Sequence, residues 1–244
     1  MNKIAIISDI HGNTTALKAV LKSIKEYEIT NIICLGDLVG KGPQPSEVVD
    51  ICRRECAVVV KGNWDDMISN RNDDEYELEW HRKELSDEQK VYLRNLPETH
   101  SLIFGNKEIR LFHSSSSGIY NRVHMYDSFE NHNQMFENTP FTGNTSKPEI
   151  IGYGDIHGAY IKYFRNRILF NTGSVGNPLD LNQASYVVIE EQEWKNKEKT
   201  LDFIFKRVIY DINEELKIAE SKKMPKYEEY KKELLTAVYR NRNN

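Results

Sequence analysis

The chain has 244 residues, enough for one large α/β domain or for one domain with an inserted cap. A formal net charge of −4 and a pI near 6.0 exclude a general electrostatic attraction to nucleic acid or anionic lipid, so a bound phosphate must be held locally. Three cysteines are too few, and of the wrong parity, for a disulfide framework. The residues after Met1 are predicted to form a short strand rather than a secretory leader, and no stretch reaches the length of a membrane span. We therefore expect a cytoplasmic protein that does not contact membranes.

The first sixty residues alternate between short apolar runs and helical patterns. The apolar runs at 4–8, 31–35 and 57–60 predict buried strands. Between them, apolar residues recur at helical spacing after Asn13, and a Gly/Pro-rich loop leads into a second helix at about 46–55. Strands and helices joined by short connections predict a parallel sheet covered by helices.

The rest of the chain is predicted to be a single domain, 1–244, with two additions. A polar, helical stretch at about 64–97 is expected to form a cap over the carboxyl ends of the strands, and 114–147 fits no clear pattern. Two charged helices, 213–221 and 227–239, would form a C-terminal extension at about 211–244, the last one mostly facing solvent. Further strands are predicted at 101–104, 108–112, 150–153, 161–164, 168–170, 185–190 and 202–208.

Side chains that can bind a metal ion recur at the carboxyl ends of the predicted strands. Ligands bind at this edge of open α/β sheets, so residues far apart in the sequence converge there. A mixture of carboxylate, amide and imidazole ligands suits manganese, iron, zinc or nickel. The residues in question are Asp9, His11, Asp37, Asn63, His113, Asp155 and His157.

The motifs around these residues resemble those of the calcineurin-like metallophosphoesterase superfamily. The order DIH (9–11), GD (36–37), GNWDD (62–66), FHS (112–114) and GDIH (154–157) is similar to the family pattern D-x-H, G-D, G-N-H-D/E, H and G-H-x-H. The segment NTGSVGNP (171–178) also looks like one from the small bacterial branch, some members of which resemble diadenosine tetraphosphate hydrolases. The resemblance implies an α/β fold in which two mixed β-sheets pack as a sandwich flanked by helices.

The resemblance also implies a role for each residue. Asp9, His11 and His157 would hold the first of two transition-metal ions, and Asp37 would bridge both. Asn63, His113 and Asp155 would hold the second. The two ions would generate a hydroxide and stabilise charge on the phosphoryl oxygens, which places Asp37, Asn63, His113 and His157 among the catalytic residues.

Two residues depart from the family pattern. Asp155 stands where the family has a histidine, and a carboxylate makes the second half of the site more negative. Trp64 stands where the phosphatases carry the histidine that protonates the leaving group, and indole cannot act as an acid. Either the leaving group needs no acid, as in anhydrides and activated diesters, or catalysis is lost.

Three residues are candidates for binding substrate. Lys41 stands where some relatives place an arginine and would clamp a phosphate oxygen, or is simply a solvated cation. Trp64 offers a face for stacking a nucleotide base, or packs under the cap. His124 is a candidate replacement acid. The remaining histidines, His81, His100 and His132, match no motif and are expected at the surface.

These features favour a phosphodiester or phosphoanhydride hydrolase acting on a small phosphorylated substrate, such as a dinucleoside polyphosphate. Two alternatives remain open. One is an interaction scaffold that kept the fold, like the phosphoesterase-like subunit of retromer. The other is a serine/threonine protein phosphatase, which the missing acid histidine disfavours. A pure scaffold needs none of the metal-binding residues, so their retention favours the enzyme.

Overall fold

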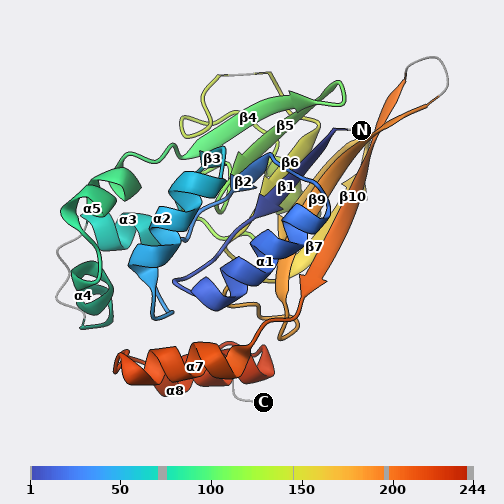
Figure 1. Cartoon of the computed structure of the whole chain (residues 1–244). Helices are drawn as coiled ribbons and strands as arrows, with labels where there is room; N and C mark the ends of the chain where they lie inside the picture. The colour runs from blue at the N-terminus through green and yellow to red at the C-terminus, as the bar shows by residue number, and fades with distance from the viewer. Residues whose placement is uncertain (1, 71–75, 145, 195–197, 241–244) are drawn as a thin grey trace.

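A computed structural model describes residues 2–70, 76–144, 146–194 and 198–240 as two five-stranded sheets packed face to face, with helices outside them (Figure 1). The predicted α/β fold with two mixed sheets is confirmed. The order of the first sheet is β10 (Lys199–Val208), β9 (Ala184–Glu193), β1 (Lys3–Ile7), β2 (Ile32–Cys34) and β3 (Val58–Val59). The order of the second is β4 (Thr99–Phe104), β5 (Lys107–Phe112), β6 (Ile150–Tyr153), β8 (Arg167–Thr172) and β7 (Ala159–Phe164).

The strands that carry the predicted site are parallel, and they have their carboxyl ends at a common edge. In the first sheet β1 pairs with β2 and β2 with β3, all parallel. In the second sheet β5, β6 and β8 are parallel neighbours. The longer β9 and β10 run antiparallel and close the other side of the first sheet.

Strand β1 shows why the predicted strands are continuously apolar. Successive side chains of a strand point to opposite faces. Ile4 and Ile6 belong to the core between the two sheets, whereas Ala5 and Ile7 belong to the core between the first sheet and its helices. Both faces of the strand are buried, so no alternation of polar and apolar residues appears in the sequence.

The helices are α1 (Thr14–Glu26), α2 (Pro45–Glu55), α3 (Asn63–Asn70), α4 (Tyr76–Lys83), α5 (Asp87–Arg94), α6 (Phe129–Gln134), α7 (Ile212–Ser221) and α8 (Tyr227–Thr236). Helices α1 and α2 cover the first sheet (Figure 1). None of the described helices has the length and apolar character needed to cross a membrane.

The segment after β5, which matches no helical or strand pattern in the sequence, covers the outer face of the second sheet. Met135 and Phe136, at the end of α6, pack against Phe112 and other buried residues of that sheet. Arg110 is fully buried beneath this segment, and its guanidinium donates to Asn138 Oδ1 (2.7 Å) and to the Ser146 carbonyl oxygen (3.0 Å). A buried arginine therefore fastens a segment that has little regular structure.

The predicted cap is helical where the structure describes it, although 71–75 lie outside the described residues. Helix α5 packs beside α2, where Gln89 Nε2 donates to Asp50 (2.8 Å) and to the Ser46 carbonyl (3.0 Å).

The expectation that the unassigned histidines lie at the surface is wrong for His81 and His132, which are 0 % and 2 % exposed. Burial lowers the pKa of His81 to about 3, so its ring is neutral.

The C-terminal extension consists of α7 and α8, which lie together beneath the helical side of the molecule (Figure 1). The last helix ends at Thr236 rather than at 239, because Ala237 adopts a left-handed conformation with φ of 54°. The expectation that this helix mostly faces solvent is also wrong, since Tyr230, Glu233 and Leu234 are buried. Residues 241–244 lie outside the described part of the chain.

Glu215 joins this extension to α1. It is fully buried, and its carboxyl group accepts hydrogen bonds from Thr15 Oγ1 (2.7 Å) and the Tyr230 hydroxyl (3.1 Å). Burial raises the pKa of Glu215 to about 7, and the two hydrogen bonds only partly offset that effect. A carboxyl group whose pKa is higher in the folded than in the unfolded chain contributes stability below its unfolded pKa. That stability is lost as pH rises through the folded pKa.

We predict that Glu215→Gln removes this loss. Between about pH 5 and pH 8 the wild type should lose about 2.5 kcal/mol of unfolding free energy relative to the variant, because glutamine does not ionise. Urea unfolding at the two pH values measures the difference. Glu214→Gln, at the exposed neighbouring position, is the control and should show no such pH-dependent gain. An equal gap between Glu215→Gln and wild type at both pH values would contradict the prediction.

Candidate metal centre

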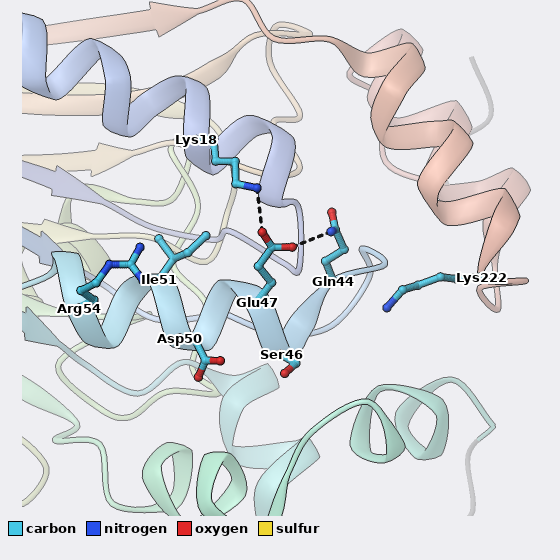
Figure 2. Close-up of a pocket in the computed structure, with 8 residues that line it drawn as sticks. All are labelled: Lys18, Gln44, Ser46, Glu47, Asp50, Ile51, Arg54 and Lys222. Carbon is cyan, nitrogen blue, oxygen red and sulfur yellow. Dashed lines mark hydrogen bonds and ion pairs between the residues drawn. The ribbon is translucent and has the colours of Figure 1, made fainter.

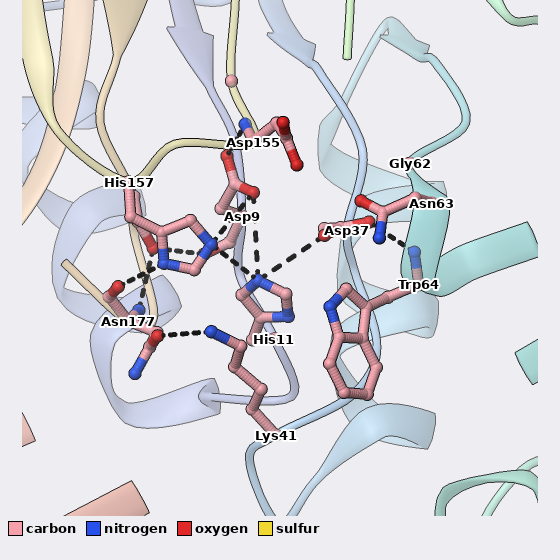
Figure 3. Close-up of polar contacts among 12 residues, drawn as sticks. Asp9, His11, Asp37, Lys41, Gly62, Asn63, Trp64, Asp155, His157 and Asn177 are labelled. Atoms are coloured by element: carbon pink, nitrogen blue, oxygen red, sulfur yellow. Dashed lines mark hydrogen bonds and ion pairs between the residues drawn. The ribbon is translucent and has the colours of Figure 1, made fainter. Parts of the chain in front are cut away.

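The predicted metal-binding residues sit just beyond strand ends, in a conformation that is unusual for them. Asp9, His11, Asp37, Asp155 and His157 have φ values of 54°, 49°, 54°, 66° and 58°. L-residues other than glycine rarely adopt this left-handed region, and each one costs about 1–3 kcal/mol. The turn that it produces directs successive polar side chains back toward a common point (Figure 3).

Asp9, His11 and His157 form the first group of side chains that could hold a metal ion. One ligand atom from each lies within 4.8 Å of the others, and all three residues are buried. The two imidazole Nε2 atoms are 3.0 Å apart, and His157 Nε2 lies 3.3 Å from Asp9 Oδ1. That oxygen is buried and accepts no hydrogen bond in the described structure. A buried carboxylate oxygen without a donor is costly unless a cation occupies the space beside it.

The second group consists of Asp9, Asp37 and His113. His113 Nε2 lies 3.4 Å from Asp37 Oδ2 and 3.0 Å from Asn63 Oδ1, so the amide oxygen of Asn63 faces the same point. Asp9 is common to both groups, whereas Asp37 is the bridging residue that the resemblance implies. His11 Nε2 nevertheless lies 3.6 Å from Asp37 Oδ2, which keeps Asp37 next to the first group as well.

Backbone carbonyl groups hold the outer nitrogen of all three histidines. Nδ1 of His11 lies 3.2 Å from the Val39 oxygen, Nδ1 of His113 lies 2.8 Å from the Leu35 oxygen, and Nδ1 of His157 lies 2.5 Å from the Asn177 oxygen. A carbonyl can only accept, so each Nδ1 carries a hydrogen and donates it. Nε2 is then the atom left to bind a metal, which is the usual arrangement of histidine ligands.

The pKa values show how strongly these groups interact. Burial would raise the pKa of Asp9, but His157 beside it lowers that pKa to about 2. Burial raises the pKa of Asp37, and the nearby Asp9 adds to the effect. Burial acts to lower the pKa of His113, yet Asp37 raises it well above the usual value. A metal ion binding at His113 must therefore displace a proton.

Asp65, to which the sequence assigned no role, fastens two of these loops together. Its carboxylate accepts hydrogen bonds from the backbone N–H groups of Gly62 (3.0 Å), Asp37 (2.9 Å) and Leu38 (2.9 Å). Gly62 is required here, because a Cβ atom on it would lie 2.0 Å from Asp37 Oδ1. The motif GNWDD already contained Asp65, but hydrogen bonds to backbone leave no signature in sequence.

Trp64 lies beside the first group. Its backbone N–H donates to Asp37 Oδ1 (2.9 Å), and its ring meets that of His11 edge-on, with centroids 5.9 Å apart (Figure 3). The ring also packs over Gly40, where a Cβ atom would lie 2.3 Å from it. The side chain remains partly exposed. Trp64 thus packs against the protein and still borders the site.

Lys41 is near the centre but is not a solvated cation. It is 6 % exposed, and its Nζ donates to Asn177 Oδ1 (2.8 Å). Asn177 in turn donates to Glu233 of α8 (3.0 Å), and Glu233 accepts a hydrogen bond from Arg240 Nε (2.9 Å). Burial lowers the pKa of Lys41, although Glu233 opposes that effect. No motif in the sequence predicts that the C-terminal extension reaches this lysine.

His124 belongs to neither metal-binding group. It is exposed, and its carbonyl oxygen accepts a hydrogen bond from His132 Nε2 (2.9 Å).

Asp155 lies closer to the centre, with its Oδ1 atom 3.8 Å from His113 Nε2, but it also belongs to neither metal-binding group. Both of its carboxylate oxygens face Arg122, a residue that the sequence did not single out because it lies in no motif.

A pocket elsewhere on the surface contains none of the predicted site residues. It lies between α1 and α2, with Lys222 across from them, and Glu47 there accepts hydrogen bonds from Lys18 and Gln44, each at 2.7 Å (Figure 2). Lys18 and Glu47 are exposed, with side-chain exposures of 62 % and 41 %. This pocket lacks the buried carboxylates and imidazoles of the metal centre.

Comparison with known proteins agrees with the geometry. The model of the calcineurin-like phosphoesterase superfamily domain matches residues 2–193. The uncharacterized protein MJ0912 of Methanocaldococcus jannaschii is 28% identical over 236 residues, which are 92% of this chain and 94% of that protein.

Two solved structures share the fold over nearly their whole length. A metallophosphoesterase from Sphaerobacter thermophilus has a TM-score of 0.77 at 24% identity, covering 97% of this chain and 99% of its own. The hypothetical protein PH1004 from Pyrococcus horikoshii has a TM-score of 0.80 at 22% identity, covering 96% and 98%.

We predict that manganese raises the melting temperature of the wild type and that Asp9→Asn abolishes most of this rise. Asp9 belongs to both groups, so its loss weakens both metal positions at once. A metal ion that binds only the folded protein raises the melting temperature, and weaker binding reduces that rise. Calorimetry with and without MnCl₂, with elemental analysis of the bound metal, measures the effect. Asp202→Asn, at an exposed position of β10, should behave as wild type. An undiminished rise in Asp9→Asn would contradict the assignment.

Proposed function

This chain belongs to the calcineurin-like phosphoesterase superfamily, and we propose that it is a metal-dependent hydrolase of phosphodiester or phosphoanhydride bonds in small nucleotides, such as dinucleoside polyphosphates. The observation that carries the proposal is the buried Asp9 oxygen, which has no hydrogen-bond donor and lies beside the Nε2 atoms of two histidines. Hydrogen bonding within the protein leaves this oxygen unsatisfied, whereas a bound cation would satisfy it.

The residues divide between two positions for metal ions. Asp9, His11 and His157 would hold one ion, while Asp37, His113 and Asn63 would hold the other with Asp9 between them. Divalent ions at such a centre activate a water molecule and offset the negative charge of a phosphoryl group. The backbone carbonyls behind the histidines keep the rings oriented, so little reorganisation is needed when substrate binds.

The preference for diesters and anhydrides comes from Trp64. No proton can come from its ring, so the leaving group must depart as an anion of low basicity. A nucleotide or nitrophenolate leaving group meets that requirement better than a serine alkoxide does. The partly exposed ring beside His11 also offers apolar surface to a nucleotide base, a contact worth about 1–3 kcal/mol.

The prediction that tests this function compares three substrates in the presence of manganese: bis-nitrophenyl phosphate, the alkyl monoester phosphoserine and diadenosine tetraphosphate. We expect the diester and the tetraphosphate to be hydrolysed in preference to the monoester, because the basic serine alkoxide needs an acid that the site lacks. Release of nitrophenolate, release of inorganic phosphate and chromatography of nucleotides are the measurements.

Asp37→Asn and Lys18→Ala are the matched variants for this assay. Asp37→Asn should reduce turnover by at least about a hundredfold, because it removes a charge from the metal centre. Lys18→Ala, in the separate surface pocket, should leave turnover unchanged. Absence of turnover for all three substrates with manganese, iron or nickel would favour the scaffold alternative, and a preference for the monoester would overturn the argument from Trp64.

We further predict that Trp64→His raises the relative rate for the monoester by about tenfold or more, since general acid catalysis contributes about 10²–10⁴-fold where an acid is correctly placed. The ratio of kcat/KM for phosphoserine, whose alkoxide leaving group needs an acid, to that for the bis-nitrophenyl diester is the measurement. Trp64→Phe separates the acid from the loss of indole, because phenylalanine keeps an aromatic ring without adding a proton donor. An equal change of the ratio in both variants would contradict the prediction.

A further inference from the structure

Arg122 forms a bidentate ion pair with Asp155 at the edge of the metal centre. Its Nε donates to Oδ2 (2.8 Å) and its Nη2 to Oδ1 (2.7 Å), and Ser114 Oγ donates to Oδ2 (3.0 Å). Asp155 is buried, with 3 % of its side chain exposed, whereas 49 % of the Arg122 side chain is exposed. The pair therefore points from the interior of the site toward solvent.

The ion pair between Arg122 and Asp155 neutralises a negative charge that the site has in excess of the family pattern. Asp155 stands where the family pattern has a neutral histidine, so the chain gains one negative charge beside Asp9 and Asp37. A guanidinium group remains protonated at every relevant pH, and bidentate contact with Asp155 neutralises that added charge. Since Asp155 already accepts three hydrogen bonds and belongs to neither metal-binding group, its main partner is Arg122.

Arg122 retains hydrogen-bonding capacity that the ion pair does not use. A guanidinium group has five N–H bonds, of which contact through Nε and Nη2 uses two. Among the described residues, Asp155 alone accepts a hydrogen bond from Arg122. The remaining N–H bonds, on Nη1 and Nη2, can reach an anion that arrives from solvent, and their planar geometry matches two oxygens of a phosphate.

Lys41, the other cation near the centre, has no such freedom. It is buried, donates to Asn177 and lies close to Glu233 beneath the C-terminal extension. A phosphate could meet its Nζ only if these contacts were broken. Arg122 is half exposed, and its guanidinium is held by the carboxylate of Asp155. The backbone N–H of Asp155 in turn donates to Asp9 Oδ2 (3.0 Å).

We propose that Arg122 binds a phosphoryl oxygen of the substrate and that Asp155 orients it for this purpose. The proposal rests on the proposed function, because it names a residue that recognises the phosphate at the same site. Arg122, rather than Lys41, would then clamp a phosphate oxygen of the substrate. Asp155 then positions a substrate-binding residue and keeps the net charge of the centre equal to that of a site with histidine.

The test measures binding of inorganic phosphate by calorimetry to protein loaded with manganese, so that it does not depend on turnover. Arg122→Ala should weaken phosphate binding by about ten- to a hundredfold, as expected for a charged hydrogen bond. Arg122→Lys should recover only part of this loss, because an ammonium group cannot contact Asp155 and phosphate with a planar fork. Manganese content, measured by elemental analysis, should equal that of the wild type in both variants.

Arg53→Ala is the matched control. Arg53 also pairs with a carboxylate, donating to Glu88 (2.9 Å), but it lies on α2 outside the metal centre, and its loss should leave phosphate affinity unchanged. Unchanged affinity in Arg122→Ala would overturn the proposal. So would a loss of affinity that follows a change in manganese content, since Arg122 would then act on the metal alone.

Failure of this inference and failure of the proposed function give different results. Hydrolysis of the diester by wild-type protein, together with unchanged phosphate affinity in Arg122→Ala, would refute only the role of Arg122. Phosphate binding that depends on Arg122, without turnover of any substrate, would uphold the binding role and refute the hydrolase.

Discussion

Asp9 and Asp37 are buried carboxylates at the ends of neighbouring parallel strands. Burial and the charge of Asp9 raise the pKa of Asp37, whereas His157 lowers the pKa of Asp9 against the effect of burial. Two such groups cannot remain side by side unless the surrounding backbone fixes them and a positive charge compensates them. The fold supplies the first requirement through left-handed residues at the strand ends and through the carboxylate of Asp65. The second requirement explains why imidazole nitrogens face the same point.

The ligands are held by parts of the chain that lie far from them in sequence. The Asn177 carbonyl orients His157, while the side chain of the same asparagine joins Lys41 to Glu233 on α8. Ser174 Oγ donates to the Asp9 carbonyl (2.7 Å) from the same loop. The loop after β8 thus connects the first metal-binding group with the C-terminal extension, so a disturbance of α8 can reach His157 without touching the metal directly.

The strands and the list of metal-binding candidates could be predicted because both depend on local patterns. A strand buried on both faces must be apolar throughout, as β1 is, and a ligand must be a residue that binds metal, as Asp9 is. The roles of Arg122 and Glu233 could not be predicted, because an arginine or a glutamate in a polar segment looks the same whether it is solvated or paired. The covering of the second sheet by the segment around Phe136 was missed for a related reason: its apolar residues follow no helical or strand period.

The contact between Lys41 and the C-terminal extension has a consequence for how the protein is made. During synthesis the ribosome releases Asp9, Asp37 and His157 well before Glu233, and β1 cannot pair with β9 until residues 184–193 have emerged. Until then the carboxylates of the centre lack part of the framework that surrounds them, and Lys41 lacks its acidic neighbour. The long separation along the chain makes these late contacts slow to form. The nascent chain therefore acquires its metal ligands early and a rigid metal centre only after β9 and Glu233 have emerged.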